Sequence, residues 1–150
     1  MTRGNWALTA SLTGIVARDV VAGLLGSEGA QAVARAAVQA AASRGARVRF
    51  LQVIEAPAGA DVHPLAVDGA TDERNAAFTA ALRALREFPR VPVTFELAAG
   101  DPGPVLVERS ADAGILVLAA TLPEDVTSYC QRHAACDILT VRPTAVARLA

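Results

Sequence analysis

The residues with nucleophilic, acid–base or metal-ligating side chains are few and dispersed along the chain. Cys130 and Cys136 stand six positions apart, and the only two histidines, His63 and His133, are far from each other in sequence. Zinc sites use three or four such ligands at short, regular spacings. We therefore expect no metal site, and we expect both cysteines to be reduced and largely buried.

The other candidates for catalysis are equally isolated. Ser27, Ser110 and Ser128 belong to no Gly-x-Ser-x-Gly elbow, and neither histidine is placed to activate them. All 14 basic residues are arginines, which excludes a lysine Schiff base and a Walker lysine. Adjacent carboxylates such as Glu124 and Asp125 before a helix are typical of caps. The sequence predicts no catalytic site and no enzyme activity.

Composition limits the partners of the protein. A chain of 150 residues with 53% hydrophobic residues is one domain with a sizeable core. The net charge of −1 gives no field that attracts nucleic acid or an anionic membrane. No stretch approaches the ~20 apolar residues of a membrane span, and the N-terminus lacks a signal-peptide pattern. We expect a cytoplasmic protein.

The order of elements predicts an α/β fold. Five strands alternate with helices, a pattern typical of a doubly wound parallel sheet with helices on both faces. Two strands are apolar throughout and belong at the centre, whereas the third contains Pro92 and alternates like an edge. We expect the strand order 3-2-1-4-5, from strands at Val20–Leu25, Val48–Ile54, Val91–Leu97, Ile115–Ala119 and Asp137–Arg142.

The helix and domain boundaries follow from local signals. Ser27 is a good N-cap for the first helix, and Asp72 opens the second, with Phe78, Ala81, Leu82 and Leu85 expected inward. We expect an N-terminal extension over residues 1–18, one domain over 19–143 and a short tail over 144–150. Within the extension, Leu12–Val16 either adds a strand or packs across an edge of the sheet.

Three segments together resemble the universal stress protein family over roughly residues 20–143. The first is VVAGLLGSEGAQAVARAAVQAAASRGARVRFLQVIE, whose opening is similar to a strand that ends in Gly-x-Asp-Gly-Ser. The second is Ala99-Gly100-Asp101-Pro102, similar to the family's entry to helix three. The third, RHAACDILTVR at 132–142, resembles the family's His-Ala-Pro-Cys-Pro-Val ending. The resemblance implies the universal stress protein fold, with a nucleotide crevice at the ends of strands one and four.

The resemblance also implies that this crevice has lost its ATP-binding groups. In members that bind ATP, an aspartate ends strand one, where this chain has Leu25. In those members a Gly-x-x-Gly motif follows strand four, and a Gly-Ser or Gly-Thr pair comes later in the same loop. Here the first glycine of the motif falls near Ala119 or Ala120, and the later pair aligns with Glu124-Asp125. The loop between them is also several residues shorter. A loop without glycine or a basic residue, and with two carboxylates, is a poor phosphate site. The vestigial crevice comprises Gly23, Leu25, Gly26, Val53, Ala119 and Thr121.

We therefore expect a dimeric regulatory or interaction module that binds neither ATP nor another cofactor. The resemblance implies pairing through the last strand, with Ile138, Leu139, Thr140 and Val141 at the interface, and an unknown protein partner remains possible. The alternative is a universal stress protein that binds a nucleotide or other small ligand in an altered crevice. Slow nucleotide hydrolysis is a weaker third hypothesis.

Overall fold

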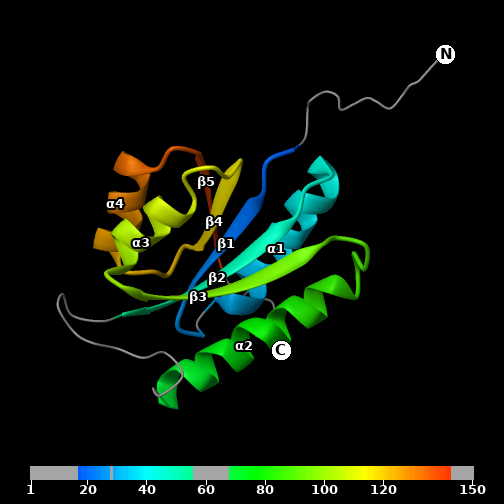
Figure 1. The fold of residues 1–150 in the computed structure, drawn as a ribbon, viewed down its shortest axis with the longest axis horizontal. Coiled ribbons are helices and arrows are strands. Elements are labelled where there is room, and N and C mark those ends of the chain that lie inside the picture. The colour runs from blue at the N-terminus through cyan, green and yellow to red at the C-terminus, as the bar shows by residue number, and fades with distance from the viewer. Residues whose placement is uncertain (1–16, 28, 56–67, 143–150) are drawn as a thin grey trace.

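A computed structural model describes residues 17–27, 29–55 and 68–142 of the chain. Five parallel strands alternate with four helices, as the sequence predicts (Figure 1). The expectation for Leu12–Val16 concerns residues outside this described part, and His63 also lies outside it. The elements are β1 (Val20–Leu25), α1 (Ala30–Arg44), β2 (Val48–Glu55), α2 (Asp68–Leu85), β3 (Val93–Gly100), α3 (Pro102–Arg109), β4 (Ile115–Ala119), α4 (Glu124–His133) and β5 (Asp137–Val141).

The strands lie in the order β3-β2-β1-β4-β5, which confirms the predicted topology. Val20 of β1 is in register with Val48 on one side and with Ile115 on the other. The central β1 and β4 are buried on both faces, apart from the last residue of β1. β3 and β5 are the edges, and β3 begins two residues later than predicted, after Pro92.

The helices cover the sheet in two pairs, α1 with α2 on one face and α3 with α4 on the other (Figure 1). Side chains alternate along β1, so that Val20 and Leu24 join the first apolar cluster and Val21 joins the second. This alternation explains why both central strands read as continuous apolar runs. None of the helices in the described ranges is long and apolar enough to cross a bilayer.

The start of α1 differs from the prediction. Its N-cap is Gly29, in the left-handed conformation at φ 76°, and Ser27 instead accepts a hydrogen bond at its carbonyl from the Ala30 amide. The helix ends at Gly45, which adopts the left-handed φ of 68° and donates its amide to the Ala41 carbonyl. α2 begins at Asp68, one turn before the predicted Asp72.

The predicted inward face of α2 is wrong at two positions. Phe78 and Leu82 are 51% and 50% exposed, although Ala81 is buried as expected. The inward face is instead a stripe of alanines at helical spacing, and these pack in the same cluster as the alanines of α1. Small side chains let the two helices approach closely, and this leaves the larger residues of α2 outside. The stripe comprises Ala77, Ala80, Ala81 and Ala84.

A charged network on the α3 side of the sheet joins Asp19, directly before β1, to residues of β2, β3 and α3. The Arg49 side chain, 15% exposed, lies with its Nε 3.7 Å from an Asp19 oxygen and 3.8 Å from a Glu96 oxygen. Its Nη2 donates to the Arg109 carbonyl, and Arg109 Nη1 lies 3.4 Å from Glu96 Oε1. Glu96 is thus balanced by two guanidinium groups of its own chain.

Candidate nucleotide crevice

The crevice predicted from the sequence lies where β1 and β4 end side by side. The chain leaves β1 through α1 toward β2 and leaves β4 through α4 toward β5, so the connections diverge at this point. Such a switch point is the usual ligand site of an open parallel sheet. Of the described residues, Gly26, Ser27 and Gly29 follow β1 on one side of it, and residues 120–123 form the loop after β4 on the other.

An apolar residue occupies the end of β1. Leu25 is half-buried, is in register with the fully buried Val53 of β2, and packs against the core on the α3–α4 side. A leucine side chain has no hydrogen-bonding group to offer an adenine or a ribose. Leu122 of the opposite loop also packs against this core.

Gly23 lies within the core rather than at the mouth of the crevice. A Cβ added there would lie 2.7 Å from Leu106 Cδ2 and 2.8 Å from Leu118 Cδ2. The space beside its backbone is therefore filled by two leucines of α3 and β4. Gly23 therefore permits close packing of α3 on the sheet.

The segment after β1 meets the end of β4 at Gly29 and Ala119. A Cβ added to Gly29 would lie 2.8 Å from the Ala119 Cβ and 3.8 Å from Thr121 Oγ1. Gly26 also has positive φ, at 71°, but a Cβ there would meet no atom within 4 Å. The sequence reasoning missed Gly29. The sequence does carry a signal for it, because Gly29 stands directly before the alanine-rich helix, whereas the prediction placed the N-cap at Ser27.

The loop after β4 uses its amides within the protein. Ala120 donates to the Val141 carbonyl at 2.8 Å, and Leu122 donates to the Ala119 carbonyl at 3.2 Å. In a phosphate-binding loop, such amides point at the ligand. These two are engaged, so they are not available for a phosphate in this conformation.

Two carboxylates occupy the positive end of α4. Glu124 and Asp125 are exposed in its first turn, and Pro123 is the N-cap. Asp125 was predicted to cap the helix through its side chain, but it lies inside the helix and the N-cap has no side-chain hydrogen bond. The two negative charges still interact favourably with the positive end of the helix dipole, and they would repel a phosphate.

The last strand leaves one side of its backbone free of any described strand, because β5 pairs only with β4 within the described sheet. Leu139 is 39% exposed and Thr140 is exposed. Ile138 and Val141 are half-buried against their own core, on opposite faces of the sheet. The four residues predicted for an interface therefore lie on an edge, with Leu139 the most exposed apolar side chain among them.

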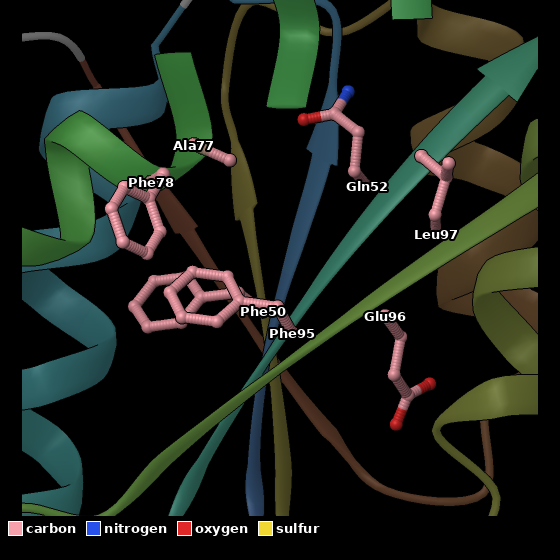
Figure 2. Close-up of a pocket in the computed structure, with 7 residues that line it drawn as sticks. All are labelled: Phe50, Gln52, Ala77, Phe78, Phe95, Glu96 and Leu97. Atoms are coloured by element: carbon pink, nitrogen blue, oxygen red, sulfur yellow. The ribbon is translucent and has the colours of Figure 1, made fainter. Parts of the chain in front are cut away.

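A cavity of about 510 Å³ lies elsewhere, between α2 and strands β2 and β3. Phe50, Phe78 and Phe95 group together on one side of it, while Gln52 and Leu97 line another part (Figure 2). The Glu96 carboxylate points away from the rings (Figure 2). This cavity is on the α1–α2 face, and sequence reasoning missed it because Phe78 was assigned to the core.

The two cysteines are free thiols, Cys130 buried and Cys136 half-buried. Burial is the main cause that raises the pKa of Cys130 to about 11, and burial also raises the pKa of Cys136. Thiols with raised pKa values are poor nucleophiles at neutral pH. Among the described residues, no group of three or more His, Cys, Asp or Glu side chains is placed to hold a metal ion.

Comparisons with known proteins agree with this architecture. A universal stress protein family member from Burkholderia pseudomallei is 23% identical and matches over 85% of this chain and 96% of that chain, with a TM-score of 0.64. The universal stress protein from Archaeoglobus fulgidus in complex with dAMP is 20% identical, with 85% of this chain and 98% of that chain covered and a TM-score of 0.63. A universal stress protein in complex with cAMP is 19% identical, with the same two coverages and a TM-score of 0.67. At these identities the likeness shows the fold. A search of curated protein sequences finds no significant match. The model of the universal stress protein family matches residues 17–142, and the chain belongs to this family.

Proposed function

We propose that this universal stress protein is a dimeric regulatory or interaction module that does not use ATP. The observation that carries the proposal is the contact between Gly29 and Ala119, which places the start of α1 against the end of β4 in the crevice. Leu25 at the end of β1 and the carboxylates of Glu124 and Asp125 support it. A triphosphate here would meet an apolar wall, engaged amides and negative charge.

The proposal includes the absence of catalysis and a cytoplasmic location. The raised pKa values of Cys130 and Cys136 support this part of the proposal, because they make thiol chemistry slow at neutral pH. Two free thiols suit a reducing compartment. Under this proposal the protein acts through its surfaces.

The proposed dimer forms through β5, packed antiparallel against the same strand of a second copy. A two-fold interface uses one patch twice, so a single edge strand suffices. Leu139 and Thr140 are exposed on this edge. Covering it removes the hazard of an open sheet edge.

A second candidate function is the binding of a small ligand in an altered crevice. It is favoured by two solved relatives, which are complexes with dAMP and with cAMP. A monophosphate is smaller and less charged than ATP, so it demands less of the loop after β4. Both candidates keep the same fold and differ only in whether the crevice is used.

One experiment on purified protein tests both parts of the proposal. Nucleotides released by acid from protein purified without added ligand are separated by chromatography, and the molar mass is measured by light scattering. We expect no stoichiometric nucleotide and the mass of a dimer or of a larger assembly. Stoichiometric ATP overturns the first part, stoichiometric AMP or cAMP supports the second candidate, and a monomer at tens of micromolar contradicts the dimer.

Thr140→Pro tests the dimer strand directly. Proline removes a backbone donor and distorts the strand, so association through β5 should be lost if this edge is used. The matched control is Thr121→Pro, an exposed threonine in the loop after β4. Thr140→Pro leaving the association constant unchanged would show that β5 is not the interface.

A further inference from the structure

Three large apolar side chains lie exposed together at the β3 edge of the sheet. We call Phe78, Leu82 and Phe95 the β3-edge patch; they are 51%, 50% and 45% exposed. The rings of Phe78 and Phe95 are 5.3 Å apart between centroids, and Phe95 also stacks on the buried Phe50 at 5.3 Å. Phe78 and Leu82 are one helical turn apart on α2. Clustered exposed aromatics of this kind mark interaction surfaces.

Within the described part of the chain, no strand pairs with the outer edge of β3, the strand beside the patch. β3 has eight residues, is paired only with β2 among the described strands, and is longer than β5. Natural edge strands are usually interrupted by proline, lysine, a bulge or an inward charge. Between Val93 and Gly100 the only charged residue is Glu96, whose carboxylate is balanced by Arg49 and Arg109 on the far face. Nothing in this strand prevents another strand from pairing with it.

The sequence of β3 is complementary to itself in one antiparallel register. If Phe95 lies opposite its own copy, Val93 lies opposite the copy's Leu97, and Thr94 lies opposite the copy's Glu96. Val93, Phe95 and Leu97 share one face of the strand, so this face becomes apolar across the joint. On the other face, the only carboxylate meets a hydroxyl rather than a second carboxylate.

We propose that a second copy of the chain binds the β3-edge patch, with β3 antiparallel to the partner's β3 and Phe95 on the two-fold axis. The α2 helices of the two copies then approach each other over the joint, and Phe78 and Leu82 become covered. This contact does not depend on the proposed β5 dimer. Because β3 and β5 are opposite edges of the sheet, both contacts can exist in one assembly, which then grows beyond a dimer.

Cysteine cross-linking tests the register. In a Cys136→Ser background, Phe95→Cys should form a disulfide-linked dimer under mild oxidation, because equivalent residues on the axis are neighbours. Val93→Cys and Leu97→Cys should each cross-link poorly alone and efficiently when mixed, with a tag on one protein to identify the mixed dimer. Glu108→Cys, exposed on α3, measures cross-linking by random collision. Phe95→Cys at the collision rate overturns the proposal, as does self-linking by Val93→Cys that equals that of Phe95→Cys.

Sedimentation velocity separates the two edges. Leu82→Glu changes an exposed helix residue and should weaken association through β3 at least about 10-fold, which corresponds to about 1.4 kcal/mol. The unmodified protein should exceed the mass of a dimer at high concentration. The Leu82→Glu variant should form only the β5 dimer, and the Thr140→Pro variant should form only the β3 dimer. The double variant should be monomeric. If Leu82→Glu leaves the mass distribution unchanged, the β3 proposal fails; if only Thr140→Pro leaves it unchanged, the β5 dimer fails instead. Urea unfolding checks that each variant is folded.

Discussion

Gly29 and Ala119 are in contact where the segment after β1 meets the end of β4, so close that a Cβ on Gly29 would lie 2.8 Å from the Ala119 Cβ. This contact brings the start of α1 to the end of β4. It forms at the switch point, where an open parallel sheet usually holds its ligand. Glycine is required at position 29 for two reasons, its φ of 76° and the absence of a side chain.

Gly29→Ala should therefore destabilise the fold by about 2–3 kcal/mol, from backbone strain and the collision with Ala119. The matched control is Gly26→Ala, which has a similar φ of 71° but meets no atom within 4 Å, so it should cost about 1 kcal/mol. Urea unfolding of both variants gives the two values. Equal losses would show that the contact with Ala119 carries no energy.

Arg49→Met should lower the free energy of unfolding by about 1–3 kcal/mol, because Asp19 and Glu96 lose a shared cation that is mostly shielded from water. The control is Arg35→Met. Its pair with Glu87 involves side chains that are 61% and 52% exposed, so its loss should be below about 0.5 kcal/mol. Urea unfolding at neutral pH compares the two, and similar losses would contradict the role given to Arg49.

The Cys130 thiol should make stability fall at high pH. Burial raises its pKa from 9.0 to about 11, so as pH rises the unfolded thiol loses its proton before the folded one does. The unfolded state then binds fewer protons, and the free energy of unfolding decreases between pH 9 and about 11. Cys130→Ala removes this contribution. Urea unfolding at several pH values should show that the free energy of unfolding falls more steeply with pH for the unmodified protein than for the variant. Parallel curves for the two proteins would refute this role of Cys130.

The sheet was predictable because its signals are local and repeated. The continuous apolar runs at Val20–Leu25 and Ile115–Ala119 are typical of strands that helices cover on both faces. Pro92 and the alternation of apolar and polar residues after it are typical of an edge strand. These patterns place β1 and β4 in the interior of the sheet and β3 at an edge. The end of α1 also has a local signal, because Gly45 adopts the left-handed conformation that commonly stops a helix.

The outward face of α2 was not predictable from hydrophobicity alone. The helix carries two apolar stripes, one of alanines and one with Phe78 and Leu82, and the larger residues were assigned inward. Close approach of α1, itself rich in alanine, selects the small stripe, and this is a property of two helices together. The same limit applies to Gly29, because its requirement comes from Ala119, ninety positions away in sequence.

The central claim is that the crevice does not bind ATP, and isothermal titration calorimetry with ATP and Mg²⁺ tests it most directly. We expect a dissociation constant no tighter than ~1 mM, a standard free energy of about −4 kcal/mol. The double variant Leu25→Asp and Glu124→Gly should bind no better, because the loop after β4 remains short and its amides remain engaged. A micromolar dissociation constant for the unmodified protein would contradict the account.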